Sequence, residues 1–332
     1  MQPTNRIANV LGGCAAQWNN QHFDLAKLTF AMDVPSDPTY HTPVLLKDVI
    51  ELLRPTAGHT VVDCTVGTGG HSLSILPHLL PTGRVIALDH DVQALEMAQQ
   101  RLAEFAPQLT FAQDNFRHLP ELLSRVGVER VQGLLADLGI SSLHVDRAER
   151  GFSFSKEGPL DMRMDVRQTT TAASLVHRLS ERDLAHVLEV YGEERWARRI
   201  AKRIVMARMM QPIETTTQLA RIVADAVPQH SASRHLHPAT RTFLALRIAV
   251  NDELKALEAL VAVLPDLLEV GGRAVIISFH SLEDRLVKRA FQHGAQQGIF
   301  RLLTKKPLRA SEQEVRDNPR SRSAKLRAVE RI

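Results

Sequence analysis

The first half of the chain has the hydrophobic pattern of short buried strands that alternate with amphipathic helices. Apolar runs predict strands beginning at Val61 and spanning residues 84–89, 109–112 and 131–137, and longer stretches predict helices at 45–53, 72–80, 92–105 and 116–126. This alternation predicts an α/β fold with a doubly wound, mainly parallel sheet, in which ligands bind beyond the carboxyl ends of the strands. The helix at 45–53 is expected to cover the edge of the sheet before the first strand.

The pattern becomes mainly helical after residue 145. Helices are expected at 172–179, 181–191, 193–210, 217–226 and 238–260, and the next strand-like run is 272–279. We therefore predict a discontinuous core, residues 39–145 and 251–300, interrupted by a helical domain, residues 146–250, that recognises the substrate. Residues 1–38 lack periodicity and are expected to form a largely disordered extension, and residues 301–332 a basic C-terminal tail.

A glycine cluster follows the first predicted strand. The sequence from Val61 to His71 is V-V-D-C-T-V-G-T-G-G-H, and its glycines permit positive φ angles and close approach of the backbone to a ligand. A dinucleotide fingerprint starting at Gly67 needs glycine or alanine at position 72, where this chain has Ser72. The tighter G-x-G-G cluster is more typical of loops that bind S-adenosylmethionine (SAM), although such a turn is also common as a mere connection.

The second predicted strand ends in an acid. Asp89 follows the glycines by about 20 residues, the place where doubly wound folds hold a carboxylate against ribose hydroxyls. Asp91 directly precedes the next helix, so it is expected to cap that helix. Asp89 is therefore the expected cofactor contact.

Composition limits the classes of protein to which the chain belongs. With 332 residues, 44% of them hydrophobic, and no apolar run near the roughly 20 residues of a membrane span, we expect a cytoplasmic protein without a membrane segment. The only cysteines, Cys14 and Cys64, are too few for a disulfide framework or a Cys-based zinc site. His235 and His237 lack further ligands at matching spacing, so no metal is expected.

Positive charge is concentrated at the end of the chain. Residues 301–332 carry ten Lys and Arg against four Asp and Glu, while the whole chain has a net charge of only +4. Such a segment either contacts nucleic-acid phosphates or is merely solvated. The same two readings apply to the predicted helix 193–210, whose cations are Arg195, Arg198, Arg199, Lys202, Arg203 and Arg208.

Eight motifs in order resemble the bacterial ribosomal RNA small subunit methyltransferase H family, which methylates N4 of a cytidine in 16S rRNA. They are H-T-P-V-L-L (41–46), G-T-G-G-H-S (67–72), D-L-G-I-S-S (137–142), E-R-G-F-S-F (149–154), G-P-L-D-M-R-M-D (158–165), H-P-A-T-R-T-F (237–243), S-F-H-S-L-E-D-R (278–285) and N-P-R-S-R-S-A-K-L-R (318–327). The resemblance implies a Rossmann-like SAM-dependent methyltransferase core with an inserted helical domain, SAM as cofactor, and 16S rRNA in the small ribosomal subunit as partner.

The resemblance also implies roles for individual residues. The implied SAM contacts are Gly69, Gly70, His71, Asp89, Phe116, Asp137 and His144. Asp137 is also the candidate catalytic acceptor of an amine proton, and the candidates for holding cytidine or phosphate are Arg163, Asp165, His280, Ser281, Arg320 and Arg322. Two positions depart from the family pattern: His144 and Leu244 stand where a glutamine is usual.

Three other functions compete with this hypothesis. A nucleotide-dependent oxidoreductase would use the same strand, turn and helix, but it would not explain Ser72 or the series of motifs. A SAM-dependent methyltransferase acting on another RNA or nucleobase, and a non-catalytic rRNA-binding assembly factor, are the remaining alternatives. The sequence leaves the oligomeric state open, with a homodimer as one option.

Overall fold

The computed structural model describes residues 42–228 and 237–332, which all belong to one compact unit, Ser36–Ile332. The expected extension at residues 1–38 lies outside the described residues, as do His41 and His235. Among the described helices, none has the length and apolar character needed to cross a bilayer.

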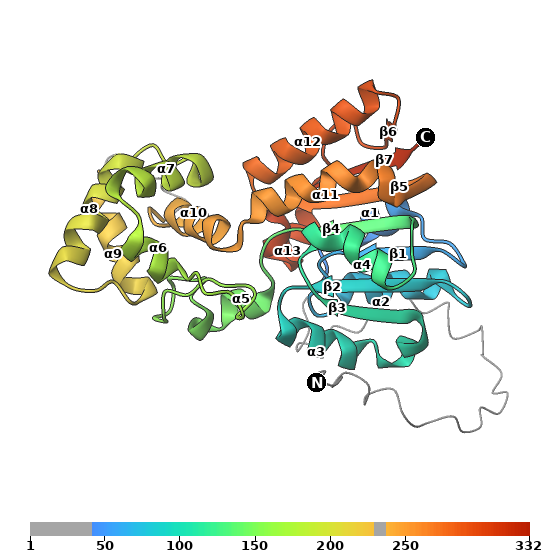
Figure 1. Cartoon of the computed structure of the whole chain (residues 1–332), viewed down its shortest axis with the longest axis horizontal. Helices are drawn as coiled ribbons and strands as arrows, with labels where there is room; N and C mark the ends of the chain where they lie inside the picture. Colours follow the sequence, from blue (N-terminus) through green and yellow to red (C-terminus); the bar gives the residue numbers. More distant parts are fainter. Residues whose placement is uncertain (1–41, 229–236) are drawn as a thin grey trace, which may run out of the picture. The chain divides into compact units, whose positions relative to one another are not determined.

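The core of this unit is a twisted sheet of seven described strands in the order β3-β2-β1-β4-β5-β7-β6 (Figure 1). The strands are β1 (Thr60–Asp63), β2 (Arg84–Asp89), β3 (Leu109–Gln113), β4 (Val131–Asp137), β5 (Leu268–Ser278), β6 (Phe300–Leu302) and β7 (Lys325–Arg331). β1 to β5 are mutually parallel, and β7 is antiparallel to β5 and β6. The predicted parallel, doubly wound sheet is therefore confirmed, with an antiparallel addition at one side.

Alternate residues of each strand pack against different helical layers. Val61 and Leu135 join one buried cluster with α1 (Leu46–Leu53), α2 (Gly70–Leu79) and α3 (Val92–Arg101). Val62 and Leu134 join the opposite cluster with α4 (Leu119–Arg125), α11 (Glu253–Leu267) and α12 (Ser281–Gln296). The prediction that α1 covers the edge of the sheet was wrong: α1 packs against the central strands β4 and β5.

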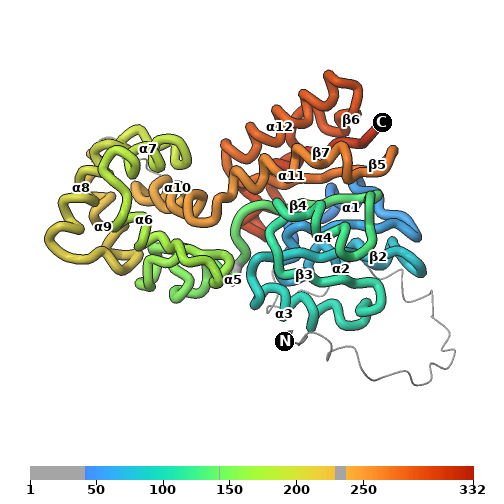
Figure 2. Tube along the Cα trace, in the orientation of Figure 1, coloured from blue at the N-terminus to red at the C-terminus, as the bar shows by residue number. Residues whose placement is uncertain are grey.

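The chain leaves the sheet after β4 and returns to it through α11 (Figure 2). The intervening helices are α5 (Ser142–Asp146), α6 (Ala172–Arg178), α7 (Glu181–Gly192), α8 (Ala197–Met210), α9 (Thr216–Ala226) and α10 (Thr240–Asn251). They bury a hydrophobic cluster of their own, with Leu188, Ile200 and Leu219 among its members. The single helix predicted over 238–260 was wrong, because Asp252 adopts φ 53° and separates α10 from α11.

The prediction that residues 301–332 form a separate tail was also wrong. β7 lies between β5 and β6 and buries Leu326, Ala328 and Val329. Cations of this segment are paired with acids: Arg327 and Lys325 with Asp284 of α12, and Arg301 with Glu330 within the segment itself. The alternating apolar positions of K-L-R-A-V-E-R therefore determine its structure more than its charge does. Much of the positive charge of the segment is neutralised within the fold.

Replacing the buried side chain of Leu326 by alanine tests the place of β7 in the core. We expect Leu326→Ala to lower the free energy of unfolding by about 2–4 kcal/mol, because it leaves a cavity against the sheet. The exposed Lys306 offers a control, since Lys306→Ala is expected to change stability by less than about 0.5 kcal/mol. Urea unfolding of both variants measures the difference, and equal stabilities would mean that β7 does not belong to the core.

Candidate active site

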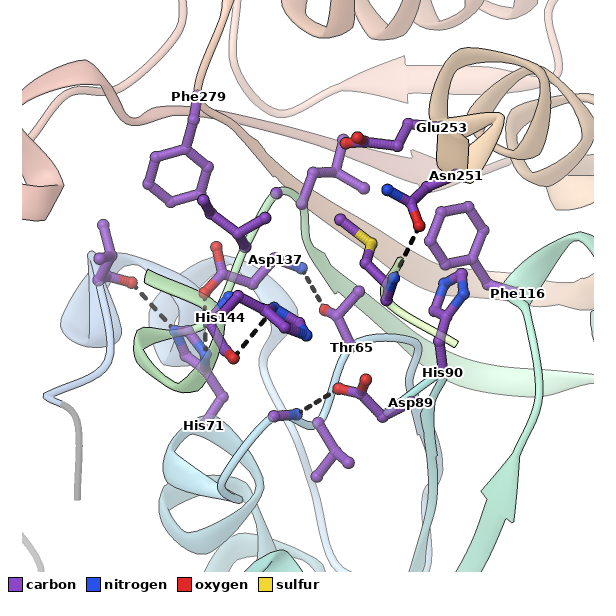
Figure 3. Close-up of a pocket in the computed structure, with 18 of the residues that line it drawn as sticks. Thr65, His71, Asp89, His90, Phe116, Asp137, His144, Asn251, Glu253 and Phe279 are labelled. Atoms are coloured by element: carbon purple, nitrogen blue, oxygen red, sulfur yellow. Dashed lines mark hydrogen bonds and ion pairs between the residues drawn. The ribbon is translucent and has the colours of Figure 1, made fainter. Parts of the chain in front are cut away.

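A pocket opens at the carboxyl ends of β1, β2, β4 and β5 (Figure 3). Its wall includes the glycine loop after β1, Asp89 after β2, Asp137 at the end of β4 and Phe279 after β5. Residues that sequence reasoning missed complete it: Thr65, His90, Met164, Asn251, Glu253 and Glu283. The core and the end of the helical insert thus share one cavity, at the edge of the sheet where a ligand was expected.

The glycine loop brings backbone, rather than side chains, to this wall. Gly69 has φ 83° and forms the N-cap of α2, and a Cβ on Gly70 would lie 2.7 Å from Pro43 Cγ. Gly70 and His71 line the pocket together with Gly67 and Thr68, whereas Gly69 stands behind them and shapes the turn. Gly70 is therefore required by its close packing against Pro43, and the loop contributes backbone to the pocket wall.

Asp89 holds the loop and faces the pocket (Figure 3). One carboxylate oxygen accepts a hydrogen bond from Gly67 N at 2.9 Å, and the other accepts one from Asp91 N at 3.0 Å. Each oxygen keeps acceptor capacity for a further donor, as a ribose hydroxyl would require. Asp91 caps α3 through its bond from Gln93 N, 2.9 Å, as predicted, whereas the role of Asp89 as a cofactor contact stays a prediction.

Phe116, an implied SAM contact, lies at the boundary between the hydrophobic core and the pocket. It is only 6% exposed and belongs to the hydrophobic core, yet its ring also lines the pocket. The ring of His90 meets it edge to face, with centroids 5.9 Å apart. Burial lowers the pKa of His90, so this part of the wall presents a neutral, aromatic surface.

Asp137 has an unusual environment for a carboxyl group. Its backbone N donates to Thr65 Oγ1 at 2.7 Å, which fixes the end of β4, while its buried Oδ1 has no hydrogen-bond partner in the described structure. Oδ2 lies 3.8 Å from Nδ1 of His71, whose Nε2 is 3.0 Å from the Val44 carbonyl oxygen. Burial, and then the neighbouring Asp63 and Glu283, raise the pKa of Asp137 well above its usual value.

Asp63 lies beneath Asp137 as a second buried acid. Its carboxylate accepts hydrogen bonds from Ser72 Oγ at 2.7 Å and from Thr65 N at 3.2 Å. Burial raises the pKa of Asp63 to about 6, despite these two hydrogen bonds. Asp63 and Asp137 are therefore neighbouring buried carboxyl groups, of which Asp137 lines the pocket, and the charge of Asp63 opposes ionisation of Asp137.

His144 lines the pocket but already has partners for both ring nitrogens. Nε2 lies 2.9 Å from Asp91 Oδ2, and Nδ1 accepts from Ser141 N at 3.2 Å. Arg150 donates to the same Asp91 oxygen at 2.6 Å. Burial opposes ionisation of Asp91, but the bonds from His144 and Arg150 outweigh it and lower its pKa. The ring nitrogens of His144 are thus committed to the protein, and only its ring remains to contact a ligand.

The candidate substrate residues are mostly engaged within the protein. Arg163 forms two bonds to Asp161, at 2.7 and 2.8 Å, and donates to two loop carbonyls. Asp165 pairs with Arg167, and Ser281 donates to Glu193 at 2.7 Å. These contacts order the 158–168 loop and the start of α12, and among the six candidates only Arg320 lines the pocket.

The other two candidates differ in exposure and in position. Arg322 is exposed, and His280 caps α12 with its Nε2 3.1 Å from Glu283 Oε1. Arg320 pairs with Asp146 at 3.2 Å. The structure therefore does not gather the six predicted substrate residues into one group.

One cluster of potential metal ligands borders the pocket. Atoms of Glu253, His280 and Glu283 lie within 4.8 Å of one another. Arg247 donates to both oxygens of Glu253, at 2.9 Å each, and Glu283 accepts from Phe279 N at 2.8 Å. Both carboxylates therefore already have hydrogen-bond partners within the protein. Through these contacts the cluster links α10, α11 and α12.

Residues 38–332 match the sequence profile of the MraW methylase family. The chain belongs to this family. Its sequence is 47% identical over 308 residues to the ribosomal RNA small subunit methyltransferase H of Geotalea uraniireducens, covering 88% of this chain and 99% of that protein. The protein of the same name from Acidobacterium capsulatum is 50% identical over 298 residues, with 88% and 98% covered. The resemblance inferred from the eight motifs is confirmed.

As a member of the MraW methylase family, the protein is a SAM-dependent methyltransferase. The alternatives of an oxidoreductase and of a non-catalytic assembly factor are therefore excluded. Among solved structures, an rRNA methylase from Streptococcus thermophilus is 13% identical with a TM-score of 0.41, covering 86% of this chain and 93% of that one. The predicted Rossmann-like core with a helical insert agrees with the observed sheet and its interruption after β4.

Asp89 offers a direct test of the cofactor side of the pocket. We expect Asp89→Asn to weaken SAM binding about 10- to 100-fold. The substitution removes a charged acceptor for the ligand and weakens the hydrogen bond by which residue 89 holds the glycine loop. Calorimetric titration measures this, and Asp225→Asn on the exposed surface of α9 should bind SAM like the unmodified methylase. If Asp89→Asn binds SAM with unchanged affinity, Asp89 does not contact the cofactor.

Proposed function

We propose that this methylase transfers the methyl group of SAM to the exocyclic N4 of a cytidine in 16S rRNA of the small ribosomal subunit. The observation that carries the proposal is the single pocket in which the glycine loop, Asp89 and Asp137 converge at the carboxyl ends of the strands. The relatives named ribosomal RNA small subunit methyltransferase H, similar over nearly their whole length, supply the class of substrate. An enzyme acting on ribosomal subunits would work in the cytoplasm.

The residues present suit SAM. Gly67 and Gly70 bring bare backbone to the pocket wall, and Asp89 has acceptor capacity for ribose hydroxyls. The aromatic edge formed by Phe116 and His90 suits a purine ring. SAM supplies, when bound, a methyl group made electrophilic by a positively charged sulfur, and that positive charge would favour the ionised form of Asp137 in the pocket wall.

We assign Asp137 the role of proton acceptor. The lone pair of cytidine N4 is delocalised into its ring, so an acceptor that withdraws an N–H proton makes the amine a better nucleophile. In the balanced reaction the N–CH₃ bond forms, the S–CH₃ bond breaks, and the N4 proton passes to the carboxylate. Oδ2 of Asp137 is the available oxygen, because the side chain keeps 23% of its surface exposed while Oδ1 is buried.

Labelled methyl transfer tests the function as a whole. Small subunits from cells lacking this methylase are incubated with labelled SAM and the enzyme, and the RNA is digested for nucleoside mass analysis. N4-methylcytidine is the expected product. Label on another nucleoside would mean that the protein is a methylase with a different target nucleoside. If subunits from several assembly stages all remain unlabelled, the proposal is rejected.

The role of Asp137 predicts a loss in the rate of transfer. We expect Asp137→Asn to lower kcat at saturating SAM by about 10²-fold or more, because an amide oxygen is a poor base. SAM affinity is expected to change by less than about tenfold, a loss of under ~1.4 kcal/mol. If kcat stays within a few-fold of the unmodified enzyme while Asp225→Asn behaves identically, another group accepts the proton.

The raised pKa of Asp137 predicts that SAM binding releases a proton. The free pocket favours the neutral acid, whereas a bound cation favours the carboxylate, so affinity should rise with pH until the free-state pKa is passed. Calorimetry in buffers of different ionisation enthalpy counts the proton. The groups facing Asp137 are Asp63, His71 and Glu283, and burial raises the pKa of Asp63 to about 6, so the proton count is taken over a range of pH for both the methylase and Asp137→Asn. Asp137→Asn should abolish the release; a release that persists would place it elsewhere.

A further inference from the structure

One face of α8 is fully turned toward solvent and carries a distinctive set of side chains. We define the outer face of α8 by its exposed residues, Arg198, Arg199, Lys202, Arg203, Met206, Met209 and Met210. The opposite stripe, Ala197, Ile200, Ala201 and Ile204, is buried in the core of the insert. The helix is anchored among α6, α7 and α9, so it presents the outer face on a rigid support (Figure 1).

The cations of this face are unneutralised. Arg198, Arg199, Lys202 and Arg203 form no hydrogen bond or ion pair with any residue in the described part of the chain. In contrast, Arg117, Arg150 and Arg247 are each paired with a carboxylate. Acids including Glu189 border Arg198 and Arg199, so the excess of positive charge is strongest at Lys202 and Arg203.

The same face continues into three exposed methionines. Met206, Met209 and Met210 are 51%, 79% and 87% exposed, in the last turns of α8. Each turn of the helix advances about 5.4 Å, so cations and thioethers follow one another along one line. Flexible methionine side chains pack favourably against aromatic rings, and adjacent exposed apolar side chains mark a binding surface.

We propose that the outer face of α8 binds a single-stranded or looped segment of small-subunit rRNA. The guanidinium and ammonium groups contact phosphates, and the methionines pack against the faces of unstacked bases. RNA fits better than an acidic protein surface, because every nucleotide offers an aromatic base next to a phosphate. It therefore suits both the methionines and the cations of the outer face of α8. The proposal rests on the proposed function, since it assigns the face to the same RNA that carries the target cytidine.

The salt dependence of binding tests the proposal. The variant Arg199→Gln/Lys202→Gln/Arg203→Gln removes three positive charges. Its control is Arg54→Gln/Arg84→Gln/Arg130→Gln, which removes three exposed cations near the amino ends of strands: Arg54 and Arg130 precede β1 and β4, and Arg84 is the first residue of β2. Binding of the full chain to protein-free small-subunit rRNA is measured at several salt concentrations. For the α8 variant, the slope of log Kobs against log salt should shrink by about 2 to 3, at roughly 0.7–0.9 for each lost phosphate contact.

A second variant isolates the methionines. Met206→Ser/Met209→Ser/Met210→Ser should weaken binding about tenfold or more without changing the slope, because stacking contacts release no counterions. SAM binding should be unchanged in both α8 variants, which shows that the fold is intact. A slope equal to that of the unmodified methylase, or an equal loss in the control variant, overturns the proposal.

Assembled small subunits distinguish a protein occupant from RNA. If the α8 variants weaken binding to subunits but not to protein-free rRNA, the face binds a ribosomal protein and the proposal is wrong. The labelled methyl transfer described above is run in parallel. If cytidine N4 stays unmodified but the salt slopes are as expected, the proposed function is wrong and the RNA-binding role of the outer face of α8 stands. The two proposals can therefore fail separately.

Discussion

The buried carboxylate of Asp91 joins the helical insert to the sheet. It caps α3, which follows β2, and it receives both His144 and Arg150 from the beginning of the insert. Arg150 also donates to the carbonyls of Arg163 and Met164, so the same ion pair holds the loop that reaches the pocket. Breaking a buried pair of this kind typically costs about 3–5 kcal/mol, since it leaves an uncompensated charge. The position of Met164 in the pocket wall therefore depends on a carboxylate two residues beyond the predicted ribose contact.

The opposite side of the insert is fixed by Asn251. Its amide donates to the carbonyls of Met162 and Arg247 and accepts from Met164 N, so it joins the end of α10 to the same loop. Thus two buried polar groups, one from the core and one from the insert, hold the 158–165 segment between them. Full hydrogen bonding makes such polar groups stabilising rather than costly, and it gives the pocket one defined shape.

Local patterns were sufficient for much of the core. The alternation of apolar residues predicted β2 and β4 to the residue, and the G-x-G-G cluster followed by an acid predicted the pocket wall at Gly70, His71 and Asp89. The prediction of a separate tail was wrong because net charge was weighted above the period-2 pattern of β7, whose cations Lys325 and Arg327 pair with Asp284. Asn251 and Glu253 gave no signal in the sequence, because they enter the pocket through a left-handed residue, Asp252, that interrupts an otherwise continuous helical pattern. Arg163 and Ser281 resemble binding residues in the sequence, and only three-dimensional contacts show that protein partners already hold them.

The neighbouring strands β4 and β5 are adjacent in space but separated by about 130 residues of chain. The entropy of closing a loop rises only with the logarithm of its length, about 0.6 kcal/mol for each doubling. A crossover of about 30 residues would therefore save little more than ~1 kcal/mol relative to this insert, even before the insert's own core is counted. The sheet is thermodynamically almost indifferent to the size of what is placed between these two strands. Descendants of such a chain can lengthen, shorten or reshape the helices of the insert, while the sheet keeps its register and its stability.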